Sequence, residues 1–83
     1  MNNKDVLFFI DRASFPVTCP ELEDFKMLTE GYSHFELNTD DPTTVFREAL
    51  KASEKYELVV PVTRNFYVRD RLKMEGVSLI ISL

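Results

Sequence analysis

The sequence predicts a small three-layer α/β domain with a mostly parallel, four-stranded sheet. Three observations support this fold class. Strand-like and helical segments alternate in the order βαβαβαβ, two of the strand-like segments are solid apolar runs, and turn residues separate the segments. A chain of 83 residues suffices for one small domain, which we expect to span residues 1–83.

Two apolar segments predict the centre of the sheet. Residues 5–11 carry an unbroken apolar run from Val6 to Ile10, and residues 57–62 carry a second one. Strands that are apolar on both faces need a helical layer on each side. Residues 33–38 and 77–83 instead alternate between apolar and polar side chains, which predicts edge strands. Right-handed crossovers then give the strand order 2-1-3-4.

Two helices have recognisable starts. The first begins at Cys19 or Pro20, because proline suits the first helical position, and we expect Gly31 to be its C-cap. The second has Asp41 as its N-cap, followed by Pro42. The residues expected on the buried faces are Leu22, Phe25 and Leu28 in the first helix and Val45, Phe46, Ala49, Leu50 and Ala52 in the second.

The segment 64–76 is compatible with two structures. As a helix, it has Asn65 as N-cap, Gly76 just after its end, and an Arg71–Glu75 pair spaced i,i+4. As a strand, it would turn at Glu75-Gly76 and form a hairpin with the last residues. That turn favours φ > 0, which is costly for glutamate. We therefore predict the helix, and with it a fourth strand parallel to the third.

Residues 18–62 resemble a glutaredoxin. Thr18-Cys19-Pro20 opens a helix, residues 38–42 resemble that family's acidic turn, and Val60-Pro61 resembles its cis-proline step. The resemblance implies a thioredoxin-like fold with a C-terminal β-hairpin, and a monothiol redox site in which the helix N-terminus activates Cys19. Leu22 stands where a dithiol site has its second cysteine. The alternative is that Cys19 simply packs at the start of a helix.

Residues 56–83 are similar instead to a strand–helix–strand unit of nucleoside monophosphate kinases. The matching features are the turn at residues 61–64 and the entry into a strand at residues 75–77. Those enzymes need a Gly-rich loop with a lysine after their first strand, which holds phosphates. Here that loop, residues 11–16, contains neither glycine nor lysine, so we expect no kinase activity.

Composition narrows the class of partner and the compartment. The chain is 45% hydrophobic and 29% charged, with a formal net charge of −4, so it is disfavoured as a binder of nucleic acid or anionic membrane. A basic protein partner is the simpler expectation. The single Cys19 cannot form an internal disulfide, which indicates a reducing compartment. The sequence has neither a signal-peptide pattern nor a membrane-spanning apolar segment, so we expect a cytoplasmic protein.

Few side chains suggest catalysis or metal binding. His34 is the only histidine, and we expect it to be solvated on the polar face of an edge strand. Asp40-Asp41 could contribute to a metal site, but Asp41 is better explained as a helix cap, and no second cysteine or histidine could complete a zinc site. We therefore expect no catalytic residue, no cofactor and no metal.

The best candidate site for a small ligand is the crevice at the carboxyl ends of the two central strands. The helices that follow these two strands leave toward opposite faces of the sheet. Two arginines there would favour an anion through charge-assisted hydrogen bonds. Alternatively, these arginines merely offset the surrounding acidic side chains. The candidate contact residues are Arg12, Ser14, Thr63, Arg64 and Asn65.

Together these observations predict a small acidic protein without catalytic activity. We expect it to act by binding another macromolecule, most simply a protein whose activity it modulates. The alternatives are a domain that binds a small anionic ligand at the crevice and a monothiol redox protein that uses Cys19.

Overall fold

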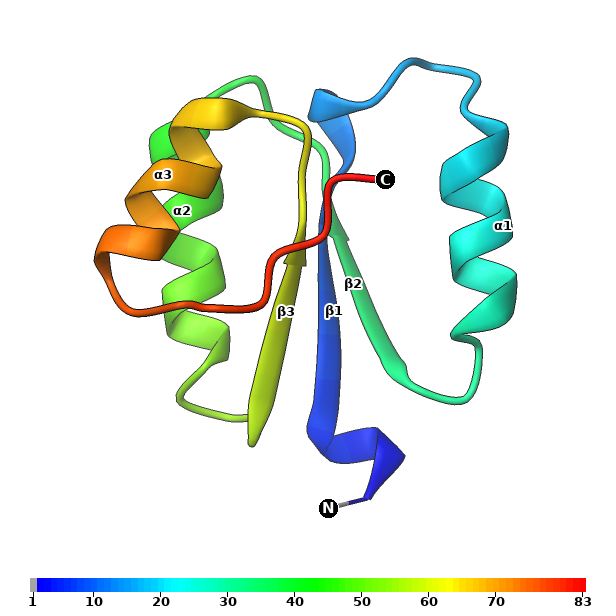
Figure 1. Ribbon diagram of the computed structural model, residues 1–83, viewed down its shortest axis with the longest axis horizontal. Coiled ribbons are helices and arrows are strands. Elements are labelled where there is room, and N and C mark those ends of the chain that lie inside the picture. Colours follow the sequence, from blue (N-terminus) through cyan, green and yellow to red (C-terminus); the bar gives the residue numbers. More distant parts are fainter. Residues whose placement is uncertain (1) are drawn as a thin grey trace.

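The structure, a computed structural model that describes residues 2–83, is built on a parallel sheet of three strands (Figure 1). Their order is β2-β1-β3, so β1 is central, as its apolar run predicts. Short 3₁₀ turns at Asn3–Asp5 and Arg12–Ser14 flank β1. The strands are β1 (Val6–Asp11), β2 (Ser33–Leu37) and β3 (Leu58–Val62).

Helices cover both faces of this sheet, which confirms the predicted α/β class. The helices are α1 (Pro20–Leu28), α2 (Pro42–Ala52) and α3 (Phe66–Met74). Helix α1 lies on one face, and α2 and α3 lie together on the other (Figure 1). Successive β1 side chains point to opposite faces, so Ile10 packs with Leu22 of α1, whereas Leu7 and Phe9 pack with α2 and α3.

The predicted fourth strand, and with it the order 2-1-3-4, is wrong. The segment 77–83 meets β3 at a single parallel bridge between Val62 and Ile81. There the Thr63 amide donates to the Ile81 carbonyl and the Ile81 amide donates to the Pro61 carbonyl, both at 2.9 Å. Strand β3 is therefore an edge strand of the three-stranded sheet, not a central strand as predicted.

The end of α3 explains why this segment does not form a strand. The Val77 amide donates to the Leu72 carbonyl and the Gly76 amide donates to the Lys73 carbonyl, both at 3.0 Å, which is the Schellman pattern. Gly76 has φ +90° and supplies the left-handed residue that this motif requires. The first residue of the segment is therefore held at the helix, and the chain reaches β3 only near its end.

The predicted helix over 64–76 is confirmed, and the hairpin alternative is excluded. The Asn65 side chain accepts a hydrogen bond from the Val68 amide at 3.1 Å, as an N-cap should. The expected Arg71–Glu75 ion pair is not formed. Instead, the Arg71 guanidinium lies 4.5 Å from the centre of the Phe46 ring and donates to the Tyr67 hydroxyl at 2.7 Å.

Helix α1 begins as predicted but ends earlier. Cys19 is its N-cap and Pro20 its first residue. Its C-cap is Thr29, whose hydroxyl donates to the Phe25 carbonyl at 2.8 Å, so Gly31 is not the C-cap. Leu28 faces solvent instead of the core, because six residues along an α-helix rotate its side chain about 120° away from that of Leu22.

Helix α2 matches its prediction closely. The Asp41 side chain caps it by accepting from the Thr43 amide at 3.1 Å. Val45, Phe46 and Ala49 are buried against the sheet and α3. Leu50 and Ala52 are half-buried at the margin of the same core.

Two leucines of α1 test this account of the core. Leu22 is fully buried, whereas Leu28 is 85% exposed. We expect Leu22→Ala to lower the free energy of unfolding by about 2–5 kcal/mol, because it leaves a cavity in the core. Leu28→Ala should change it by no more than about 0.5 kcal/mol. Urea denaturation measures both, and equal losses would contradict the placement of α1.

Candidate functional site

Four of the five predicted ligand-binding residues come together at the carboxyl ends of β1 and β3, two through their hydroxyls and two through their main-chain amides. The Ser14 hydroxyl donates to the Asp11 carbonyl at 2.8 Å and accepts from the Arg64 amide at 2.9 Å. The Thr63 hydroxyl donates to the Asp11 carboxylate at 2.8 Å and accepts from the Asn65 amide at 3.0 Å. These bonds tie the two strand ends together around Asp11.

Asp11 is the side chain at this crevice that our candidate site omitted. It is only 4% exposed, and burial raises the pKa of its carboxyl even though the hydrogen bond from Thr63 opposes that rise. The sequence carries a signal for it, because Asp11 is the first polar residue after the apolar run of β1. A carboxylate at the carboxyl end of a central strand falls at the switch point of the sheet.

The two predicted arginines point elsewhere. The Arg12 guanidinium donates to the carbonyls of Pro16 at 3.0 Å and Val17 at 2.7 Å, and so holds the loop before α1. The Arg64 guanidinium donates to the Leu83 carbonyl at 3.1 Å and lies 5.0 Å from the centre of the Phe15 ring. We expected both guanidinium groups to bind a ligand, but they contact neighbouring segments of the chain and stabilise the fold.

The cavity at the crevice is small and carries acidic groups. Its volume is about 160 Å³, below the range typical of ligand pockets. Its walls include the carboxylates of Asp11 and Asp40 but neither arginine, so the geometry gives an anion no cationic partner there. The lining residues are Asp11, Ala13, Ser14, Thr39, Asp40, Pro42, Val45 and Asn65.

The surroundings of Cys19 favour a structural role. The side chain is buried, and its thiol donates to the Glu21 carboxylate at 3.2 Å. The pKa of Glu21 is lowered because its carboxylate accepts from its own backbone amide and from this thiol. Within residues 2–83 every peptide bond is trans, so Pro61 does not reproduce the cis-proline step of glutaredoxins.

The other polar candidates also have structural partners. His34 is half-buried rather than solvated: its Nε2 lies 2.7 Å from the Thr29 hydroxyl, and its ring packs 5.6 Å from the centre of the Phe8 ring. The Thr44 hydroxyl donates to Asp41 and holds the pKa of that carboxyl below its ordinary value. Across residues 2–83, no cluster of three or more His, Cys, Asp or Glu side chains could hold a metal ion.

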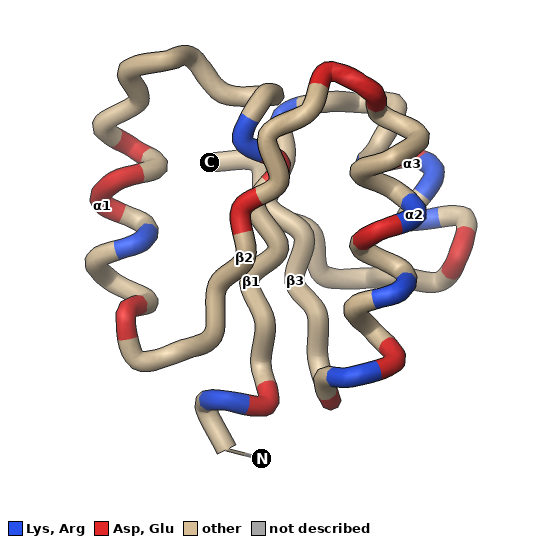
Figure 2. Tube along the Cα trace, turned by 180° about the vertical axis from the view of Figure 1, so that it is seen from behind, with Lys and Arg blue, Asp and Glu red and all other residues tan. Residues whose placement is uncertain are grey.

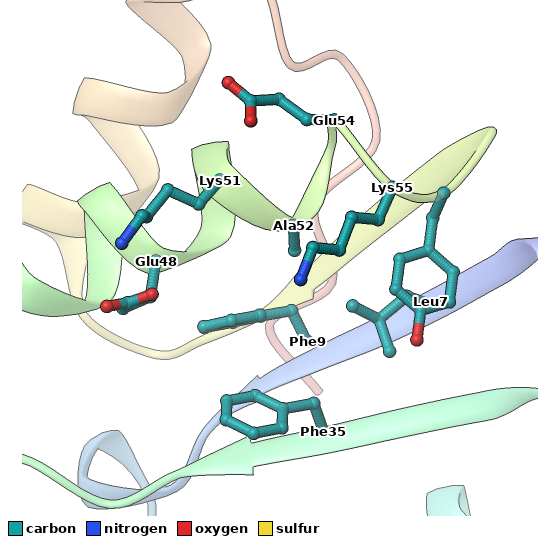
Figure 3. A pocket seen from close by; sticks show the side chains of 9 residues that line it. Leu7, Phe9, Phe35, Glu48, Lys51, Ala52, Glu54 and Lys55 are labelled. Atoms are coloured by element: carbon teal, nitrogen blue, oxygen red, sulfur yellow. The ribbon is translucent and has the colours of Figure 1, made fainter.

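A larger hollow, which we call the β2–α2 groove, lies between β2 and the end of α2 (Figure 3). Its volume is about 330 Å³, and its floor is apolar and aromatic. Phe35 lies on this floor and is 47% exposed, with its ring centre 5.4 Å from that of Phe9. The floor consists of Leu7, Phe9, Phe35, Ala52 and Tyr56, and the rim consists of Glu48, Lys51, Glu54 and Lys55.

The β2–α2 groove could not be predicted from the sequence, because alternation shows only which side chains share a face of a strand. Phe35 lies on the apolar face of β2, where we expected burial. The sequence pattern does not say how far α2 and α3 extend across that face. In the structure their buried residues pack on Leu7 and Phe9 of β1 and leave the Phe35 ring partly uncovered.

The comparisons with known proteins find no match: no family model, no curated protein and no solved structure is significantly similar to this chain. The helices of residues 2–83 are all too short or too polar to cross a membrane. The fold and the sites therefore define a structural class for this protein, and no family. The chain is a small parallel α/β domain with a structurally occupied crevice and an open aromatic groove.

Two aspartates should affect stability with opposite pH dependence. Because the pKa of folded Asp11 exceeds its ordinary 3.8, folding favours the protonated form, and the resulting stabilisation is lost as pH rises through the folded pKa. Asparagine has no such titration. We therefore expect the free energy of unfolding of Asp11→Asn, relative to wild type, to increase between acidic and neutral pH.

Asp41→Asn is the matched control. The pKa of folded Asp41 lies below 3.8, so its stabilisation is present at neutral pH and is lost as pH falls through the folded pKa. Its relative free energy of unfolding should therefore decrease from acidic to neutral pH. Urea denaturation across this range measures both variants. If the relative free energies of unfolding of the two variants changed with pH in the same direction, the opposite pKa shifts assigned to Asp11 and Asp41 would be contradicted.

Proposed function

We propose that this protein is a non-catalytic domain that binds a protein partner, and that the partner docks in the β2–α2 groove. One observation carries the proposal: Phe35 is almost half exposed and lies beside Phe9 on the floor of an open hollow. Aromatic side chains in such pockets are typical anchors of protein interfaces.

The arrangement of polar groups also supports binding over catalysis. In the β2–α2 groove the apolar residues form the floor and the charged residues form the rim, as in protein interfaces. The crevice, in contrast, is small, and its Ser14 and Thr63 hydroxyls both donate to Asp11. A reactive group there would have to break contacts that hold β1 to β3.

The partner and compartment follow from the same proposal. The net charge of −4 favours a basic partner for the molecule as a whole. The rim of the groove carries Lys51 and Lys55 as well as Glu48 and Glu54, so the positions of these four side chains decide which partner segment docks there. The domain would modulate the activity of its partner by covering part of the partner's surface. The free thiol of Cys19 suits a reducing compartment, and we propose that the protein acts in the cytoplasm.

Two exposed phenylalanines give a matched test. Phe35 lies in the β2–α2 groove, whereas Phe66 is exposed on α3 outside it. With tagged protein expressed in the source cells, Phe35→Ser should reduce capture of the bound partner about tenfold, because it removes an interface anchor. Phe66→Ser should capture as much as wild type. Equal capture by Phe35→Ser and wild type, with both folded, would contradict the proposal.

A further inference from the structure

We propose that the β2–α2 groove takes an extended, acidic segment of its partner, which adds as a strand to the free edge of β2. This inference rests on the proposed function and specifies the chemistry of the occupant. Strand addition combines main-chain hydrogen bonds with pockets for alternate side chains. The structure offers both elements at this position.

The first element is an open sheet edge. Strand β2 pairs with β1 alone, from Ser33 beside Leu7 to Leu37 beside Asp11. Throughout residues 2–83, no other segment forms a backbone hydrogen bond with residues 33–37. Half of the amides and carbonyls of β2 therefore face outward, which is the template that an added strand needs. The opposite edge of the sheet already bonds to Ile81.

The second element is an aromatic floor next to that edge. Along an added strand, side chains i and i+2 point to the same face, about 6.5–7 Å apart. An apolar side chain on the groove face would cover the exposed ring of Phe35. The side chain two residues along would then reach the rim that the end of α2 provides.

The third element is cationic charge at this rim. Lys55 crosses the opening of the groove with its ammonium above the floor, whereas the Glu54 carboxylate points away (Figure 3). Neither Lys55 nor Lys51 forms an ion pair with a carboxylate of residues 2–83. Lysine and arginine lie mainly on the α2 and α3 side of the molecule, where acidic residues are interspersed with them, and acidic residues predominate on α1 (Figure 2). A carboxylate on the added strand would therefore find a free cation.

A second copy of this chain suits the same edge poorly. Glu36 is the only carboxylate in β2, and it lies on the face toward α1, where it pairs with Lys26. If β2 paired with itself, each strand would therefore meet the lysines of the other rim without supplying a carboxylate to them. A partner segment that carries a carboxylate on the groove face would supply to Lys55 the charge that β2 lacks on that face.

A short synthetic peptide tests the proposal directly. The probe is acetyl-Thr-Ile-Thr-Glu-Thr-Ile-amide, whose apolar and acidic side chains share one face when extended. In amide NMR titrations of the full chain, we expect saturable shifts confined to residues 33–37 and 48–56. The same peptide methylated on every main-chain nitrogen should not bind, because it cannot donate to the edge of β2. Absence of saturable shifts, or equal binding of the methylated peptide, would overturn the proposal.

Charge reversal provides the matched variants. Lys55→Glu should weaken peptide binding about tenfold, because it places a like charge beside the glutamate of the probe. Lys73→Glu, on α3 outside the groove, should bind as wild type does. Equal affinity of Lys55→Glu and wild type would overturn the assignment of an acidic occupant. Concentration-dependent shifts of β2 without peptide, lost in Phe35→Ser, would assign the edge to a second copy and also overturn it.

The two proposals fail separately. If the peptide does not bind but capture of the partner still depends on Phe35, the protein-binding function stands and strand addition is wrong. If capture does not depend on Phe35, the proposed function itself is wrong, whatever the peptide does.

Discussion

The burial of β1 on both faces is the constraint on which the rest of the structure depends. Leu7 and Phe9 need cover on one face and Ile10 needs it on the other, so the chain must place helices on both sides of the sheet. Helix α1 supplies one side alone, whereas α2 and α3 share the other. The paired helices bury their apolar residues over β1 and leave part of β2 uncovered at Phe35. The groove is thus a consequence of how the central strand is covered.

The carboxyl edge of the sheet shows the opposite outcome. Here Asp11, Ser14 and Thr63 could have formed a reactive centre, but their hydrogen bonds close on one another and on nearby amides. Arg12 and Arg64 bind backbone carbonyls of the adjoining segments. In a small domain with a limited apolar core, such hydrogen bonds replace part of the apolar side-chain packing that a larger protein would have.

Local signals in the sequence predicted the elements, while their extent depended on contacts between distant segments. Asp41-Pro42 and Asn65 specify helix starts through their own side chains, so both predictions hold. The apolar run of β1 matches its central place, whereas the similar run of β3 belongs to an edge strand, because no further strand pairs along it. The fourth strand failed because, after the Schellman closure at Gly76, Val77 and Ile80 pack against the core and the chain bonds to β3 only at Ile81. For the crevice, sequence position indicated where Arg12 and Arg64 leave the sheet but not where their guanidinium groups turn.

The single bridge between Val62 and Ile81 determines the valency of the sheet. The outer side of β3 is bonded there and the outer side of β2 is open, so under the proposed strand addition the domain would be monovalent and a complex would end after one partner. Val77, Ile80 and Ile81 pack against the two core clusters, so release of residues 77–83 would expose core side chains as well as the outer side of β3. A molecule in that state would be divalent, and repeated edge-to-edge addition would yield an open-ended polymer. The C-terminal segment is thus the element that terminates growth of the sheet.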